Sequence, residues 1–130
     1  MTPFFLTIDD VLDLHDLHLG RYGGSAGVRD RGLLESAVSQ ARASFGGELL
    51  HADLAAMASA YLVSIVKNHP FVDGNKRAGL AAALTFLDLN GIAIDHSSAV
   101  LYDATMAVAE GRLDKEGVAE VFRRLGSWSA

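Results

Sequence analysis

The sequence contains no cysteine, which excludes disulfide bonds and thiolate metal sites and fits a reducing compartment. Positive charge is in the minority, because 11 Lys and Arg residues face 16 Asp and Glu residues and leave a net charge of -5. Nucleic-acid affinity comes mainly from neutralised phosphates, so this balance argues against direct nucleic-acid binding. The N-terminus has no basic segment before its short apolar run, and the longest uncharged apolar stretch, 54–66, is too short to cross a bilayer. We therefore expect a soluble, cytoplasmic protein with no signal peptide and no membrane contact.

What the chain does contain is enough apolar material for one folded core. It has 130 residues, and half of them are hydrophobic, which suits a single domain over 1–130 and argues against disorder. Capping residues and terminating glycines predict helices along most of the chain. The expected helices cover 7–21, 31–45, 54–68, 74–90, 97–111 and 114–125, and a short extended segment is expected at 92–95.

Two of these helices, 54–68 and 74–90, are apolar almost all round, which predicts that they lie buried at the centre of the molecule. Pro70 prevents the first of them from continuing and keeps His69 out of helical geometry. The expected fold class is therefore all-α, a compact bundle around two buried central helices. The loop that joins these two helices carries the most informative residues of the sequence.

That loop gathers several kinds of functional group. His69 is a possible proton acceptor near neutral pH, and Asp73 offers the hard oxygen ligand that suits Mg²⁺. Gly74 and Asn75 leave backbone N–H groups free at the start of a helix, where phosphate binds readily. The combination indicates a site for a phosphorylated ligand and its metal ion.

The two cations that follow, Lys76 and Arg77, stand at a helix end that is already positive, which is unfavourable unless an anion binds there. Each residue also has an ordinary structural interpretation. His69 could simply terminate a helix, Asp73 could be an N-cap, and both cations could extend into water. The clustering of all these groups within nine residues favours a functional site.

The stretch "HPFVDGNKR", residues 69–77, resembles the signature of the Fic/Doc superfamily, His-Pro-Phe-x-(Asp/Glu)-Gly-Asn-(Gly/Lys)-Arg, at every specified position. Upstream, "GGSAGVRDRGLLESAV" resembles a segment of the death-on-curing (Doc) toxin branch, and "FLDLNG" resembles the end of the central helix of these toxins. The resemblance covers roughly residues 5–95. It implies a Fic/Doc-type helical bundle.

The resemblance also implies a role for each matching position. His69 would take a proton from a target hydroxyl, and Asp73 would hold Mg²⁺ on the phosphates of ATP. The next four residues would bind those phosphates, and they are Gly74, Asn75, Lys76 and Arg77. Two others would set and anchor the loop, and they are Pro70 and Phe71.

Two positions bear on the reaction. Nucleotidyl-transferring Fic enzymes usually carry Gly where this chain has Lys76, and a second Arg where it has Leu80. Doc toxins share the Lys and lack the second Arg, although their best-known pattern has Ala in place of Gly74. The resemblance therefore implies a kinase-like phosphotransferase that uses ATP and Mg²⁺ and modifies a translation GTPase, elongation factor Tu. A nucleotidyl transferase (AMPylation) is the alternative enzyme, and a non-catalytic helical binding module is the alternative from another class.

The resemblance further implies a toxin of a type II toxin-antitoxin system, restrained by a separate antitoxin chain. Many Fic proteins restrain themselves through the pattern (Ser/Thr)-x-x-x-Glu-(Gly/Asn). The nearest stretch here, "TMAVAEG" at 105–111, has one residue too many between Thr105 and Glu110. An antitoxin segment that folds into an apolar groove is the expected mode of restraint.

Several other polar residues remain without an assigned role. His15 and Asp16 form the dipeptide of metal phosphohydrolases, but no further ligand set accompanies them, so a surface or packing role is favoured for His15 and for His18. Arg21, Arg29 and Asp30 could border the active site or form an internal ion pair, and the sequence does not separate these two possibilities.

Overall fold

A computed structural model describes residues 2–45, 47–51 and 53–127 of the chain. This part of the chain forms six α-helices, a 3₁₀ turn η1 and two very short strands. The helices are α1 (Ile8–Tyr22), α2 (Arg31–Ser39), α3 (Leu54–Asn68), α4 (Asn75–Leu89), α5 (Ala99–Ala109) and α6 (Lys115–Leu125). The remaining elements are η1 (Gln40–Arg42) and the strands β1 (Ser44–Phe45) and β2 (Glu48–Leu49).

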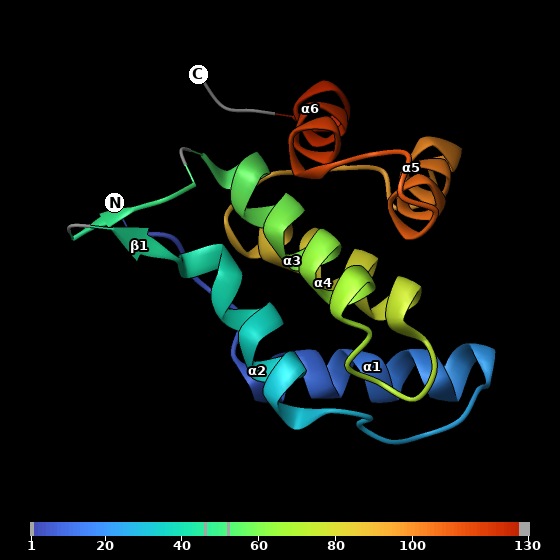
Figure 1. Ribbon diagram of the computed structural model, residues 1–130. Coiled ribbons are helices and arrows are strands. Elements are labelled where there is room, and N and C mark those ends of the chain that lie inside the picture. The colour runs from blue at the N-terminus through green and yellow to red at the C-terminus, as the bar shows by residue number, and fades with distance from the viewer. Residues whose placement is uncertain (1, 46, 52, 128–130) are drawn as a thin grey trace.

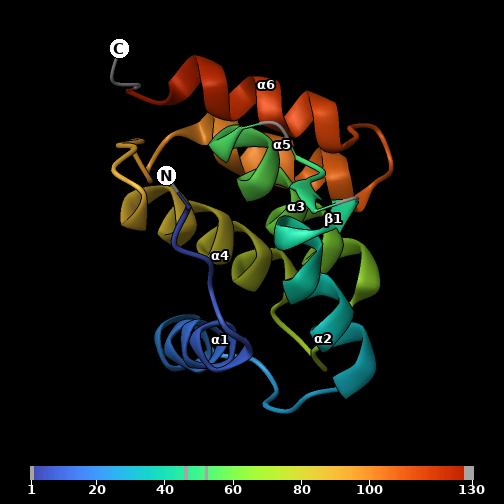
Figure 2. The same ribbon diagram turned by 90° about the vertical axis from the view of Figure 1, so that its left-hand side faces the viewer.

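The helices lie in three layers, which two views at right angles show (Figures 1 and 2). The pair α3 and α4 forms the middle layer, with α1 and α2 on one side and α5 and α6 on the other. Helix α3 packs against α4, α2, η1, α5 and α6, whereas α1 packs mainly against α4. The all-α fold class expected from the sequence is confirmed.

The two central helices are buried along most of their length, as their apolar sequences predict. Ten of the fifteen residues of α3 are buried, which leaves no face of this helix for solvent contact along its middle. Gly79 allows the close approach of α4, because a Cβ atom there would lie only 3.0 Å from Val66 Cγ2 and 3.1 Å from the carbonyl oxygen of Leu62. Close backbone contact between α3 and α4 fixes both ends of the loop that joins them.

Most helix boundaries agree with the expected ones because the capping residues form the expected hydrogen bonds. Five N-cap side chains accept a hydrogen bond from a backbone N–H in the first turn of their helices, and they are Thr7, Asp30, Asp53, Ser98 and Asp114. Gly91, with φ of 84°, provides the left-handed residue after α4. Within the expected extended segment, Ala93 forms an isolated antiparallel bridge with Ser127.

The helix expected over 31–45 is shorter than its sequence indicates. It ends at Ser39, continues as η1 to Arg42, and gives way to β1, which pairs with β2 in a two-residue antiparallel hairpin. Ala43 leaves helical geometry, with φ of -53° and ψ of 138°, and its carbonyl oxygen accepts a hydrogen bond from the N–H of Leu50, on the far side of the hairpin. Gly46, half of the expected stop signal, lies outside the described residues. None of the helices within the described ranges is long and apolar enough to cross a lipid bilayer.

Candidate active site

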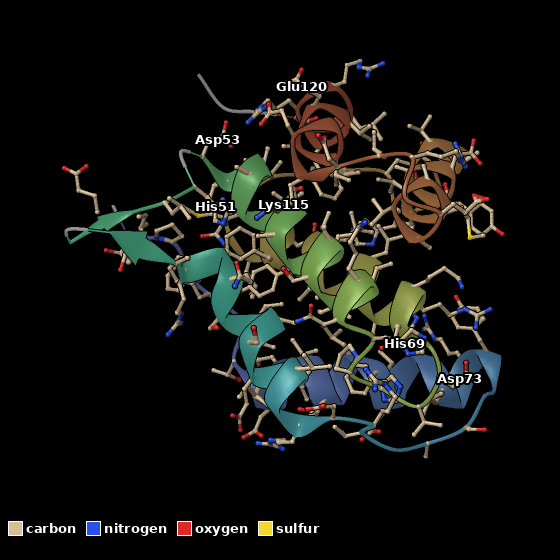
Figure 3. All side chains as sticks on the ribbon, viewed as in Figure 1. His51, Asp53, His69, Asp73, Lys115 and Glu120 are labelled. Carbon is tan, nitrogen blue, oxygen red and sulfur yellow. The ribbon has the colours of Figure 1, made fainter. Side chains whose placement is uncertain are left out.

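The loop of residues 69–74 joins the end of α3 to the start of α4 and lies at one end of the molecule. Figure 3 shows His69 and Asp73 on this loop, whereas His51 and Asp53 lie at the other end of α3. Pro70 and Phe71 are buried, while His69, Asp73, Lys76 and Arg77 are exposed. The loop is thus anchored in the core by its buried apolar residues, and its charged and titratable side chains face solvent.

Two residues in left-handed conformations bound the loop. His69 has φ of 53° and ψ of 53°, and Gly74 has φ of 79° and ψ of 20°. Within the described residues His69 is the sole non-glycine residue with positive φ, a conformation that costs on the order of 1–3 kcal/mol. Pro70 explains why His69 leaves the right-handed helical region. Gly74 has no Cβ atom, so it adopts its left-handed conformation without a steric clash. Such strained positions cluster at functional sites.

The side chain of Asn75 closes the loop on itself. Its Oδ1 atom accepts a hydrogen bond from the N–H of Phe71 at 2.9 Å, and its Nδ2 atom donates to the carbonyl oxygen of Phe71 at 3.0 Å. Both residues are buried. The sequence suggested that Asn75 helps to shape an anion site. In the structure its side-chain amide is buried and hydrogen-bonded to the backbone of Phe71.

The connector, which we define as residues 23–30, lies along the outer side of the loop. The N–H groups of Arg29 and Asp30 both donate to the carbonyl oxygen of Pro70, at 2.7 and 3.1 Å, and the N–H of Val72 donates to Gly27. These hydrogen bonds tie the loop to a segment forty or more residues away in the sequence. The connector therefore fixes the backbone on which the exposed functional groups stand.

Two side chains of the connector, Arg29 and Asp30, have defined roles that the sequence left open. The guanidinium group of Arg29 donates to the carbonyl oxygens of His69, at 2.7 Å, and of Asn68, at 3.0 Å. It thus caps the negative end of α3 and borders the site, and it forms no ion pair with any residue that the structure describes. Asp30 accepts from the N–H of Leu33 and is the N-cap of α2.

Asp73 is held as a charged group. Its carboxylate accepts hydrogen bonds from the backbone N–H groups of Ser25, at 3.1 Å, and Gly74, at 2.9 Å. The hydrogen bond from Ser25 lowers the pKa of Asp73 most, the one from Gly74 lowers it further, and the charge of Arg77 adds to the effect. The connector approaches closely here, because a Cβ atom on Gly24 would lie 2.7 Å from Asp73 Oδ2.

The start of α4 provides unpaired hydrogen-bond donors. Gly74 donates to the carboxylate of Asp73, and the first N–H that bonds back along the helix is that of Ala78, which donates to Gly74. In the described part of the chain, the intervening N–H groups of Asn75, Lys76 and Arg77 have no acceptor. Three free N–H groups beside two cationic side chains form an arrangement that suits a phosphate group.

An aromatic residue that the sequence did not single out meets one of these cations. The guanidinium group of Arg77 lies over the ring of Tyr22, with Cζ 4.6 Å from the ring centroid, and His18 stacks on the same ring with a centroid distance of 5.6 Å. Burial lowers the pKa of His18, and the charges of Arg21 and Arg77 lower it further. The end of α1 is therefore part of the site, and it directs the side chain of Arg77.

His15 is the other contributor from α1, and it takes a packing role, as favoured from its sequence. It is buried, and its ring stacks on that of Phe71 with a centroid distance of 3.7 Å and an interplanar angle of 7°. Its Nε2 atom donates to the carbonyl oxygen of Asp73 at 2.8 Å. One signal of this role was in the sequence, because His15 follows the buried Val11 by four residues and shares its helix face.

The residues present fit a magnesium ion that arrives with a nucleotide better than a resident metal. No group of three or more His, Asp or Glu side chains able to hold a metal ion occurs in the described part of the chain. Mg²⁺ in nucleotide sites is usually held by one or two carboxylates together with phosphate oxygens and water. Asp73, a charged and exposed carboxylate beside free N–H groups, offers one such ligand.

A hollow in the described structure lies away from the loop. It has a volume of about 610 Å³ and is lined by the N-terminal segment, the start of α3 and the end of α4, including Phe4, Leu54 and Leu89. The candidate site itself is an open surface at the opposite end of α3 and α4. A ligand there would be held by charge and hydrogen bonds on one side and would remain accessible to a large second substrate.

Comparison with known proteins gives consistent results. The model of the Fic/DOC family matches residues 5–87. The chain is 36% identical over 117 residues to the protein kinase doc of Escherichia phage P1, which covers 90% of this chain and 91% of that protein. It is 42% identical over 88 residues to the toxin Doc of Mycolicibacterium smegmatis, which covers 68% of this chain and 65% of that protein. The family match includes α1, the connector and the whole loop between α3 and α4.

Proposed function

The chain belongs to the Fic/Doc family, and we propose that it is the toxin of a toxin-antitoxin system and acts as a protein kinase-like phosphotransferase. The reaction moves the terminal phosphate of ATP to a hydroxyl group of a protein. Elongation factor Tu, a translation GTPase, is the proposed acceptor, and its modification would halt translation. The names of the two relatives, a protein kinase and a toxin, support the proposal.

The observation that carries this proposal is the set of functional groups gathered at the loop and at the start of α4. An exposed His69, a charged Asp73 and three free N–H groups stand within nine residues of sequence and beside Lys76 and Arg77. Phosphoryl transfer needs little covalent chemistry from the protein and depends on positioning and on stabilised negative charge. The loop supplies both.

The proposed reaction assigns a step to each group. His69 accepts the proton of the acceptor hydroxyl as its oxygen forms a bond to the terminal phosphorus. The bond between that phosphorus and the bridging oxygen breaks, and ADP leaves with the electron pair. The free N–H groups of α4, with Lys76 and Arg77, stabilise the negative charge on the transferred phosphoryl oxygens. A magnesium ion bound through Asp73 would neutralise charge on the phosphates that remain.

The choice between the two possible transfers rests on Lys76. Its exposed side chain stands at the second residue of α4, next to the free N–H groups. A nucleotidyl transferase of this family leaves that space open with Gly, and it carries a second Arg where this chain has the half-buried Leu80. Lys76 favours a nucleotide that presents its terminal phosphate, and nucleotidyl transfer is the second candidate.

A separate antitoxin chain is the proposed restraint, as the name of the toxin relative suggests. The self-inhibitory alternative receives no support from α5. The hydroxyl of Thr105 is buried and donates to the carbonyl oxygen of Leu101 within its own helix, at 2.8 Å. This hydroxyl is therefore engaged inside α5 and does not reach the loop.

The deciding experiment compares the mass and the label of the modified acceptor. Purified protein would be incubated with Mg²⁺, elongation factor Tu and ATP labelled at either the terminal or the first phosphate. The proposal expects label from the terminal phosphate only, with a mass increase of one phosphoryl group. Label from the first phosphate would show that the protein is a nucleotidyl transferase and not a kinase. Absence of any modification, in lysate as well, would favour a binding module.

A further inference from the structure

We propose that His15 is a positioning residue of the phosphate site, a role that rests on the proposed function of the loop. It acts from α1 through a hydrogen bond to the carbonyl oxygen of Asp73 and holds Asp73 and the start of α4 in their working arrangement. His15 does not reach the exposed surface, because its side chain is 3% exposed and covered by the loop. It therefore acts through the loop and not on the substrate.

Three parts of the loop meet the ring of His15. The ring stacks almost parallel on Phe71, its Nε2–H donates to Asp73, and the backbone of Gly74 lies so close that a Cβ atom there would be 3.5 Å from Nε2. A carbonyl oxygen can only accept, so Nε2 carries the proton. The side chain of His15 thus fixes the ring plane of Phe71, the backbone of Asp73 and the first turn of α4. Asp73 is the residue whose carboxylate is the proposed metal ligand.

The hydrogen bond also fixes the backbone that immediately precedes the free donors of α4. In a helix the N–H of a residue bonds to the carbonyl four residues earlier, so the carbonyl of Asp73 is the acceptor that would pair with the N–H of Arg77. Because α4 begins at Asn75, its first N–H groups have no partner within the helix, and the carbonyl of Asp73 accepts from His15. The N–H of Arg77 is left free in the described structure, at the place where the phosphate is proposed to bind.

Helix α1, which carries His15, is itself held firmly in place. Its N-terminus carries a reciprocal capping box between Thr7 and Asp10, and Val11, one turn before His15, is fully buried. The N–H of Leu6, just before the helix, donates to the hydroxyl of Tyr61 in α3 at 2.9 Å. Helix α1, which carries His15, is therefore held against the same central helices that the loop joins.

A purely structural role for His15 makes a different prediction. If the residue only filled space, a change that keeps an aromatic ring of similar size would preserve the site, and any loss would follow the loss of stability. If the hydrogen bond to Asp73 matters, the same change would loosen Asp73 and α4 while the ring stacking remained. Three variants separate these roles: His15→Phe, which keeps the ring and removes the donor, His15→Gln, which keeps a donor, and Val11→Ala, which weakens the same face of α1 away from the loop.

The first measurement needs no ligand. Hydrogen exchange would be followed at the amides of Ser25 and Gly74, which donate to the carboxylate of Asp73. We expect faster exchange at both in His15→Phe, near wild-type exchange in His15→Gln, and near wild-type exchange in Val11→Ala. Unchanged exchange in a folded His15→Phe would overturn the proposal. If His15→Phe does not fold, the comparison of His15→Gln with Val11→Ala at matched stability decides, and loss of protection in His15→Gln alone would count against it.

The second measurement uses calorimetry with a non-hydrolysable ATP analogue and Mg²⁺. Loss of a hydrogen bond behind a metal ligand typically costs roughly tenfold to a hundredfold in affinity, which is the decrease expected for His15→Phe. Val11→Ala should bind like the wild type, and His15→Gln should recover most of the affinity. If the wild type itself does not bind the analogue, the proposed function fails while the exchange result still tests His15. If wild type and His15→Phe bind equally well, the inference about His15 is wrong.

Discussion

The guanidinium group of Arg77 lies over the ring of Tyr22, with its Cζ atom 4.6 Å from the ring centroid. Tyr22 is the last residue of α1, and Arg77 stands in the first turn of α4. An exposed cation at the positive end of a helix would otherwise turn toward water. The aromatic face of Tyr22 gives the side chain of Arg77 a defined direction.

Replacing Tyr22 with Ala should lower kcat/KM for transfer about twofold to fivefold, because an exposed cation–π contact contributes roughly 0.5–1 kcal/mol. Tyr22→Phe keeps the ring and serves as the matched control, which should behave like the wild type. Steady-state kinetics of the two variants provide the measurement. Equal losses in both would assign the effect to the hydroxyl group and not to the stacking on Arg77.

Replacing His69 with Ala should reduce transfer by about 10²–10⁴, the usual contribution of a positioned general base. Binding of the nucleotide should be little changed, because His69 contributes only its exposed side chain to the surface of the loop. His69→Asn is the control for backbone strain, since Asn tolerates the left-handed conformation that His69 adopts. Single-turnover transfer measures the effect, and undiminished transfer by His69→Asn would remove the assignment of a base.

Replacing Asp73 with Asn should reduce transfer and raise the Mg²⁺ concentration that gives half-maximal rate, because the amide keeps a hydrogen-bond acceptor and loses the charge. A magnesium titration of the initial rate provides the measurement. An unchanged magnesium response in an active variant would reduce Asp73 to a structural role at the start of α4.

The charge of Asp73 should also appear in the dependence of stability on pH. Its pKa in the folded protein lies below its ordinary value of 3.8, so the ionised form stabilises the folded state fully at pH values above that value, and the stabilisation is lost as the pH falls through the lowered pKa. The difference in free energy of unfolding between wild type and Asp73→Asn should therefore stay constant from about pH 7 to about pH 5 and shrink at lower pH. Urea unfolding at several pH values would test this, and a difference that shrinks near neutral pH would contradict it.

Replacing Asn75 with Ala should destabilise the protein on the order of 2–4 kcal/mol, because it leaves the buried N–H and C=O of Phe71 without partners. Transfer should fall as well, since the loop loses its internal brace. Asn90→Ala is a matched control, because Asn90 makes comparable hydrogen bonds to the backbone of Phe4 far from the loop. Unfolding curves and activity per folded molecule would show both effects, and full activity in folded Asn75→Ala would argue against a role in the site.

Replacing Lys76 with Gly should weaken phosphorylation and open space beside the free N–H groups of α4. Some nucleotidyl transfer could then appear, although Leu80 stands where the related nucleotidyl transferases carry a second Arg. The mass added to the acceptor by wild type and variant distinguishes the two products. A wild type that already adds a nucleoside monophosphate would make the kinase assignment wrong.

Much of the fold followed from the sequence alone, because its signals act over a few residues. Capping side chains such as Asp53 and Asp114 bond within their own first turns, and the all-round apolar sequence of 54–68 requires a central place for that helix. Pro70 determined that His69 leaves the helix. The motif 69–77 identified the loop and its family for the same reason, since its residues are adjacent in sequence.

The tertiary structure decided the contacts between segments that are distant in sequence. Arg29 bonds to carbonyl oxygens at the end of α3, forty residues away, and Ser25 bonds to Asp73 across 48 positions. His15 reaches Asp73 across 58 positions, although its sequence context showed only a helical histidine beside an aspartate. Such contacts depend on how α1 and the connector pack against α3 and α4, and no local pattern specifies that packing. The sequence therefore determined which groups the loop carries, and the packing of the helices determined how those groups are held.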